Sequence, residues 1–185
     1  MAHRVCPWWL GYLLASPVRR LLDDPRKILS PFVVEGMMVL EPGPGMGFFT
    51  IELARLVGER GKIVAVDIEP NMLEGLRRRA RKEGVLNRVD VRQATPPGLG
   101  LQDLDGRVDF ALAFAVVHEL PDQELFFADI HAALKPSGRA LVAEPKGHVK
   151  EPEFRATLKV AESAGFRVDE RPDIPRSRSA VLVKS

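Results

Sequence analysis

The sequence predicts an α/β fold in which a mostly parallel sheet of seven strands is covered by helices and ends in an antiparallel hairpin. The first observation is periodic: from Met37 onward, short apolar runs alternate with longer amphipathic stretches, as in strands joined by crossover helices. The second is compositional, because 45% apolar and 28% charged residues are ordinary for a globular protein. The third is length, since 185 residues can bury one sizeable core.

Seven short apolar runs are the predicted strands, and the first five are expected to be parallel. They cover residues 37–41, 62–66, 88–92, 108–114, 138–144, 166–171 and 179–184. Only the segment RPDIPR separates the last two, which is too short for a helical crossover. These two strands should therefore form an antiparallel hairpin, and we expect the strand at the edge of the sheet to run backwards.

Four amphipathic stretches between these runs have apolar residues at helical spacing. They cover residues 48–57, 71–83, 122–134 and 151–164, and three of them stop next to a glycine, at Gly58, Gly84 and Gly165. Residues 95–105 are rich in proline and glycine, which predicts an irregular loop or a distorted helix.

Composition and charge narrow the classes of protein that fit the chain. The length predicts a single domain, 1–185, in which residues 37–185 form the core and residues 1–36 are a lid or docking segment. The formal net charge of +2 gives little support for a nucleic-acid partner. One cysteine excludes an internal disulfide, and no run reaches the roughly 20 apolar residues of a membrane span, so we expect a cytoplasmic protein.

The segment VLEPGPGMGFFT, residues 39–50, places three glycines between a strand and a helix. Gly43, Gly45 and Gly47 allow sharp turns and close approach of a ligand to the backbone, and Glu41 ends the strand, where open α/β sheets bind their ligands. Glycines alone also suit a turn that binds nothing.

The next strand ends in Asp67, about 20 residues after the glycines, where a carboxylate can accept hydrogen bonds from ribose hydroxyls. Ile68 can then cover an adenine face. Asp67 alone could be a helix cap, but the two motifs together favour an adenosine-containing ligand. Dinucleotide sites use Gly-x-Gly-x-x-Gly, whereas this loop reads Gly-x-Gly-x-Gly with Phe48 at the third glycine's place. The acid before the glycines would repel a pyrophosphate and attract a cationic amine.

These motifs resemble those of the class I S-adenosylmethionine-dependent methyltransferases of the small seven-stranded type, over about residues 37–185. The resemblance implies a Rossmann-like three-layer sandwich, S-adenosylmethionine as cofactor and S-adenosylhomocysteine as product. It implies further that the glycine loop with Glu41 wraps the methionine part and that Asp67 binds the ribose. By the same resemblance, Gln93 and Ala94 lie beside the adenine, although the family often has Asp where Gln93 stands.

The fourth and fifth motifs of that family resemble VDFALAFAVVHEL, residues 108–120, and LKPSGRALVAEP, residues 134–145. The resemblance places Ala113 and Phe114 next to the reacting sulfonium, where many relatives have a polar residue instead of Phe114. His118 is a candidate general base, with a capping or packing role as the alternative. Glu144 is a second candidate, with a solvated loop acid as the alternative.

The acceptor is not identified by the sequence, but the leading expectation is a small molecule. Trp8, Trp9 and Tyr12 are candidates to line its pocket, or they simply cover the apolar end of the sheet. No metal site is expected, because His3 and Cys6 have a ligand-like spacing without further ligands. The alternatives that stay open are an RNA or protein methyltransferase, a non-catalytic cofactor-binding module and a dinucleotide-dependent oxidoreductase; the oligomeric state is unknown.

Overall fold

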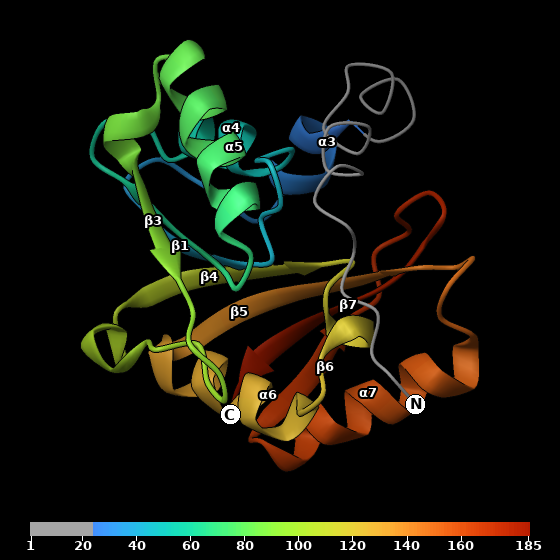
Figure 1. Cartoon of the computed structure of the whole chain (residues 1–185). Coiled ribbons are helices and arrows are strands. Elements are labelled where there is room, and N and C mark those ends of the chain that lie inside the picture. Colours follow the sequence, from blue (N-terminus) through green and yellow to red (C-terminus); the bar gives the residue numbers. More distant parts are fainter. Residues whose placement is uncertain (1–23) are drawn as a thin grey trace. The chain divides into compact units, whose positions relative to one another are not determined.

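The structure is a computed structural model, and it describes residues 24–185 (Figure 1). These residues divide after Ala94 into two compact units, here called the first unit (24–94) and the second unit (95–185). None of the helices within the described residues is long and apolar enough to cross a membrane.

The first unit is built on three parallel strands in the order β3-β2-β1. They are β1 (Met38–Pro42), β2 (Lys62–Asp67) and β3 (Val89–Gln93). The middle of β1 and of β2 is apolar without interruption and completely buried, as expected of parallel strands with helices on both faces. Pro42 pairs with Val66, and Asp67 pairs with Gln93. The carboxyl ends of the three strands therefore lie next to one another.

The helices of the first unit are α3 (Pro25–Leu29), α4 (Thr50–Leu56) and α5 (Pro70–Lys82), with a short 3₁₀ turn, η1 (Leu86–Arg88). Two of them, α4 and α5, lie where the sequence predicted helices, whereas α3 was not predicted. Glu69 caps α5 by accepting a hydrogen bond from the backbone N–H of Asn71 at 3.0 Å, and Pro70 occupies the first helical turn. Gly84, with φ +70°, ends it, as the sequence predicted.

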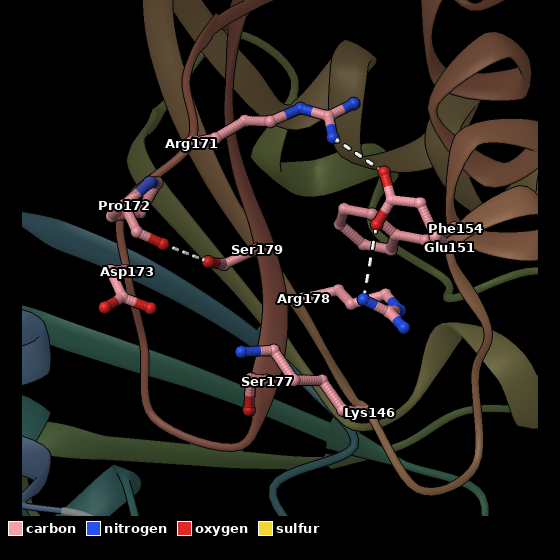
Figure 2. Close-up of a pocket in the computed structure, with 9 residues that line it drawn as sticks. All are labelled: Lys146, Glu151, Phe154, Arg171, Pro172, Asp173, Ser177, Arg178 and Ser179. Carbon is pink, nitrogen blue, oxygen red and sulfur yellow. Dashed lines mark hydrogen bonds and ion pairs between the residues drawn. The ribbon is translucent and has the colours of Figure 1, made fainter.

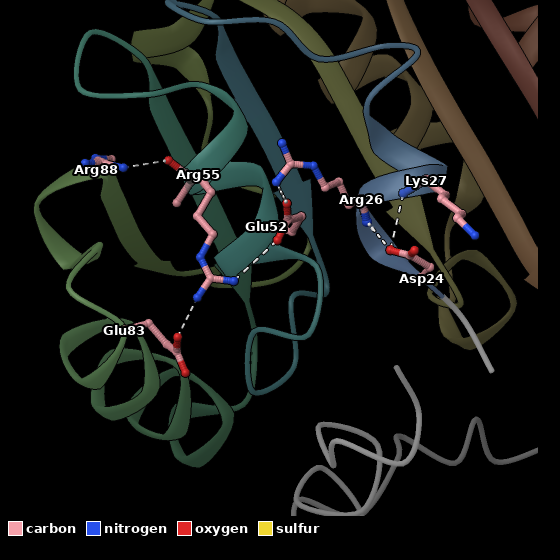
Figure 3. Close-up of polar contacts among 8 residues, drawn as sticks. Asp24, Arg26, Lys27, Glu52, Arg55, Glu83 and Arg88 are labelled. Atoms are coloured by element: carbon pink, nitrogen blue, oxygen red, sulfur yellow. Dashed lines mark hydrogen bonds and ion pairs between the residues drawn. The ribbon is translucent and has the colours of Figure 1, made fainter. Parts of the chain in front are cut away.

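Ion pairs tie α3 to α4 and α4 to the end of α5 (Figure 3). Arg26 lies 3.8 Å from Glu52, and Arg55 bridges Glu52 at 3.4 Å and Glu83 at 2.6 Å. The Glu52 side chain is only 12% exposed, so its two cationic neighbours compensate for its burial. Asp24 caps α3 by accepting from the backbone N–H of Arg26 at 3.0 Å.

The second unit has four strands in the order β4-β5-β7-β6. They are β4 (Val108–Phe114), β5 (Leu134–Pro145), β6 (Phe166–Glu170) and β7 (Ser177–Lys184). The helical elements of this unit are η2 (Gln102–Leu104), η3 (Val117–Glu119), α6 (Gln123–Ala133) and α7 (Glu151–Ser163). In Figure 1, α6 and α7 lie side by side against the strands of this unit, where Phe127 packs edge-on to Phe166 at 6.2 Å between ring centroids.

The predicted fold class is confirmed in its strands and their directions. All seven predicted strands are present, β1, β2 and β3 are parallel, β4 and β5 are parallel, and β7 is antiparallel to both β5 and β6. Residues 95–105 are irregular except for η2. The backbone reaches β5 earlier than predicted, at Leu134, which already pairs with Val108.

The expectation that the edge strand runs backwards is wrong. The reversed strand is β7, which lies inside the sheet between β5 and β6, and β6 occupies the edge. Since β6 and β5 are both antiparallel to β7, the edge strand runs in the same direction as β5. The helical crossover α7 carries the chain past the position of β7, and the short hairpin then returns it between the two strands.

Candidate functional site

The loop from β1 to α4 turns on three glycines with left-handed backbone. Their φ angles are +69° at Gly43, +53° at Gly45 and +82° at Gly47, values that other residues adopt only with strain. A Cβ on Gly47 would lie 2.5 Å from a methyl group of Leu76, so this glycine also allows close packing on α5. A Cβ on Gly45 would meet no atom within 4 Å, so the space beside Gly45 is open to a ligand.

Hydrogen bonds join the glycine loop to the end of β2. The backbone N–H of Gly43 donates to the carbonyl of Val66 at 2.8 Å. The carboxylate of Asp67 accepts from the N–H of Glu69 at 3.0 Å, and the N–H groups of Gly45 and Ile68 also stabilise it. Burial nevertheless raises the pKa of Asp67 above its ordinary value, against those hydrogen bonds. Asp67 and the glycine loop therefore lie together, as the two motifs predicted.

Glu41 is a buried acid at the end of β1. It is 3% exposed, and its Oε2 atom has no hydrogen-bond partner within residues 24–185. Burial raises the pKa of Glu41 to about 8, with a smaller opposing contribution from the Thr50 hydroxyl and a reinforcing one from the charge of Asp67. The carboxyl is therefore mostly neutral at pH 7 in the free chain, and a cation brought beside it would favour its ionised form.

The remaining predicted residues of the first unit lie at the ends of β2 and β3. The Gln93 side chain donates to the carbonyl of Ile68 at 3.4 Å, and the N–H of Ala94 donates to the carbonyl of Asp67 at 2.9 Å. Ile68 is 46% exposed, which is unusual for a large apolar side chain within residues 24–185, whereas Ala94 is buried. The structure thus brings Asp67, Ile68, Gln93 and Ala94 together at the carboxyl ends of β2 and β3, where an apolar surface lies beside a carboxylate.

In the second unit, the two candidate general bases form one hydrogen-bonded pair. Glu144, at the end of β5, is 1% exposed; its Oε1 accepts from the backbone N–H of Val117 at 2.8 Å and its Oε2 pairs with Nδ1 of His118. That hydrogen bond raises the pKa of His118 above its ordinary value, against the opposing effect of burial. The alternative of Glu144 as a solvated loop acid is wrong, because strand β5 carries it into the interior.

The His118 ring has a second neighbour that the sequence did not indicate. The ring of His148, from the loop between β5 and α7, lies edge-on to it with 5.7 Å between centroids. At the end of β4, Ala113 is fully buried while Phe114 is partly exposed, so the accessible surface at this strand end belongs to Phe114. Ala115 follows with φ +57°, a strained value for a residue with a side chain, and turns the chain toward His118.

Some predicted residues lie outside the described part of the chain. Trp8, Trp9 and Tyr12 belong to residues 1–23, and so do His3 and Cys6. Within residues 24–185, no group of three or more His, Cys, Asp or Glu side chains is arranged to hold a metal ion.

The second unit also contains an open polar pocket of about 200 Å³ (Figure 2). Glu151, at the start of α7, accepts from Arg171 at 3.2 Å and from Arg178 at 3.3 Å across this pocket. The same carboxylate accepts from Arg155 at 3.0 Å, and the hydrogen bonds from Arg155 and Arg171 lower the pKa of Glu151. Sequence reasoning missed the pocket, because its residues come from three separate segments with no shared motif. Within it, Glu151 is already paired with Arg171 and Arg178.

Comparison with known proteins agrees with this geometry. The sequence model of the Methyltransferase domain family matches residues 34–166. A ubiquinone/menaquinone biosynthesis C-methyltransferase, UbiE, from Erwinia tasmaniensis is 31% identical over 137 residues, which are 74% of this chain and 52% of that protein. The corresponding UbiE from Escherichia coli is 33% identical over 124 residues, 67% of this chain and 49% of that protein. The chain therefore spans about half the length of the curated relatives it matches.

Solved structures of methyltransferases match a larger part of the chain than these relatives do. A crystal structure of a SAM-dependent methyltransferase from Aquifex aeolicus superposes with a TM-score of 0.85 at 28% identity, covering 97% of this chain and 98% of that one. A SAM-dependent O-methyltransferase from Thermotoga maritima shares the fold, with a TM-score of 0.69 at 22% identity over 87% of this chain and 64% of that one. The chain therefore belongs to the methyltransferase domain family, among the class I S-adenosylmethionine-dependent methyltransferases.

Proposed function

We propose that this chain transfers the methyl group of S-adenosylmethionine to a small-molecule acceptor in the cytoplasm, acting as a single domain over residues 1–185. The observation that carries the proposal is the pairing of a buried carboxyl, Glu41, with the open backbone surface at Gly45. A buried polar atom without a partner is costly, so a ligand that supplies the missing partner is strongly favoured.

The residues of the first unit fit the parts of this cofactor. The cationic amine of its methionine part would be the missing partner of Glu41, and the open surface at Gly45 would admit its chain. Asp67 would accept from the ribose hydroxyls, while Ile68, Gln93 and Ala94 would border the adenine. When bound, the cofactor supplies an electrophilic methyl group on a sulfonium.

The remaining chemistry of the chain is to position the acceptor and exclude water. Ala113 and Phe114 would form the apolar wall beside the reacting methyl group, and Trp8, Trp9 and Tyr12 would line the acceptor pocket. The curated relatives are named as C-methyltransferases of ubiquinone and menaquinone biosynthesis, which favours a ring carbon of a quinone precursor as the acceptor atom.

Calorimetry with S-adenosylmethionine, S-adenosylhomocysteine and NAD tests the proposal. We expect the first two to bind and NAD not to bind; binding of NAD alone would overturn the assignment. Asp67→Ala should weaken cofactor affinity by about 1 to 3 kcal/mol, through lost charged hydrogen bonds. Asp105→Ala is the matched control, because Asp105 is exposed and precedes β4, at the opposite end of that strand from Phe114.

The acceptor class is then found by transfer of a labelled methyl group to fractions of a cell extract. Label in the small-molecule fraction supports the proposal, whereas label in RNA or protein supports the corresponding macromolecular methyltransferase. Tight binding of S-adenosylhomocysteine with label in no fraction would identify a non-catalytic cofactor-binding module.

A further inference from the structure

The polar pocket of the second unit has walls that hydrogen bonds hold in place (Figure 2). It is lined by the segment after β5, the start of α7 and the hairpin that joins β6 to β7. The backbone N–H of Lys146 donates to the carbonyl of Arg176 at 2.9 Å, which joins the first of these segments to the hairpin. The hydroxyl of the buried Ser179 donates to the carbonyl of Pro172, which joins the two sides of the hairpin. The pocket is therefore shaped by the fold itself.

Three cationic side chains from three separate segments line this pocket. Lys146 follows the end of β5, Arg171 follows the end of β6, and Arg178 belongs to β7. Nε of Arg178 donates to the backbone carbonyl of Val149 at 3.0 Å, so the orientation of this guanidinium is fixed. The fold thus gathers cations that no sequence motif groups together.

One carboxylate serves as the counter-ion of three guanidinium groups. Glu151 is that carboxylate, and its partners are Arg155 at 3.0 Å, Arg171 at 3.2 Å and Arg178 at 3.3 Å. A single negative charge cannot compensate three positive ones, so the surroundings of Glu151 keep an excess of positive charge.

Two further charged side chains line the pocket, and neither is paired. The ammonium group of Lys146 and the carboxylate of Asp173 form no hydrogen bond or ion pair with any residue from 24 to 185. Adding both to the cluster around Glu151 gives four cations and two acids. The pocket and its border therefore carry an excess of two positive charges, and one of the cations is free to bind a ligand.

We propose that this pocket binds a phosphate group, either as inorganic phosphate or as the monoester of a small metabolite. A phosphate monoester carries about 1.5 to 2 negative charges at pH 7, which matches the excess. Guanidinium groups bind phosphate oxygens through paired hydrogen bonds, and a lysine adds a mobile point charge. The volume of about 200 Å³ is several times the roughly 30 Å³ of a water molecule, so a group of five heavy atoms fits. This binding site is additional to the methyl transfer and does not depend on it.

The alternative is an ion-pair cluster with a purely structural role, in which Glu151 links α7 to β6 and β7. That role explains the positions of Arg171 and Arg178. It gives no function to Lys146 or Asp173, because neither side chain has a partner within the described residues. The two interpretations therefore differ in what substitutions of these two residues should do.

Titration of the full chain with inorganic phosphate, followed by nitrogen-15 NMR at pH 7.5, tests the proposal. The ionic strength is held constant, because salt screens exposed charges. We expect saturable shifts of the backbone amide signals of residues 146–151 and 171–179. The absence of saturable shifts there at millimolar phosphate would overturn the proposal, and so would acetate binding as tightly as phosphate.

Glycerol 3-phosphate, with glycerol as control, identifies the source of the phosphate group. Tighter binding of glycerol 3-phosphate than of inorganic phosphate would support a phosphorylated metabolite as the ligand. Tighter binding of inorganic phosphate would support the free ion. Binding of glycerol to the same residues with equal affinity would overturn the proposal, because the phosphate group would then contribute nothing.

Two substitutions should change the affinity for phosphate in opposite directions. Lys146→Gln should weaken binding about 3- to 10-fold, because a charged hydrogen-bond donor is lost. Asp173→Asn should strengthen binding about 2- to 5-fold, because a negative charge beside the ligand is removed. Lys159→Gln is the matched control, since Lys159 is exposed on α7 and does not line the pocket. Phosphate affinity that is the same in Lys146→Gln and Asp173→Asn as in the unaltered chain would leave only the structural cluster and overturn the proposal.

Discussion

Replacing Glu41 by glutamine should make the protein more stable at neutral pH and a weaker binder of its cofactor. The carboxyl has an ordinary pKa of 4.5 and burial raises it to about 8. Between these values the folded chain holds a proton that the unfolded chain releases, so the free energy of unfolding falls as pH rises. The slope approaches about 1.4 kcal/mol per pH unit, which amounts to about 3 kcal/mol by pH 7.

The assay is denaturant unfolding of the unaltered chain and of Glu41→Gln at pH 5, 6, 7 and 8. Glutamine does not titrate, so the stability advantage of the variant should grow by about 2 to 3 kcal/mol between pH 5 and pH 7. Glu59→Gln is the matched control, because this side chain of the same unit is 87% exposed and removes the same charge. An advantage of Glu41→Gln that stays constant over this pH range would refute the reasoning. The same variant should bind S-adenosylmethionine about 1 to 2 kcal/mol more weakly, because a neutral amide replaces a charged partner of the amine.

Three further predictions follow from the same geometry. Binding of S-adenosylmethionine at pH 7 should release most of one proton, because Glu41 with a pKa of about 8 is mostly protonated beforehand. Calorimetry in two buffers of different ionisation enthalpy measures this release, and Glu41→Gln should release none from this position. Gly47→Ala should destabilise the fold by about 1 to 3 kcal/mol in urea unfolding, since its Cβ would meet a leucine methyl at 2.5 Å, whereas Gly45→Ala, with open space, should cost less and chiefly weaken cofactor binding. Stability contributed by the raised pKa of His118 should be complete below pH 6.5 and be lost as pH rises through the folded-state pKa, and Glu144→Gln should abolish this dependence in unfolding curves.

The elements of the fold could be predicted because each depends on local signals. Apolar runs, helical spacing and stop residues such as Gly84 and Gly165 are written in the neighbouring sequence, and the strands and helices follow them within a few residues. The position of β7 could not be predicted in the same way. The length of a hairpin loop fixes the antiparallel direction of two strands, but it does not determine which of them lies at the edge.

The residues of the candidate site also divide into those that local sequence patterns predict and those that depend on contacts between distant segments. The sequence brought out Glu41, Gly45 and Asp67 because a strand end followed by glycines is a local pattern. The partnership of His118 with Glu144 depends instead on a contact between segments 26 positions apart, and the burial of Glu144 depends on how β5 is covered. Sequence reasoning offered the two as alternative bases, whereas the structure makes one the support of the other.

Glu41 and His118 both have raised pKa values, and the physical causes lead to different chemical uses. Burial without a partner raises the pKa of Glu41, so the acid is held neutral and becomes a carboxylate only when a cation arrives. A hydrogen bond to a buried acid raises the pKa of His118, so this imidazole is oriented before any ligand arrives. A binding group benefits from the first arrangement, since its charge appears only with the ligand. The second arrangement fixes the ring and its tautomer in advance, which is what a proton acceptor in general requires.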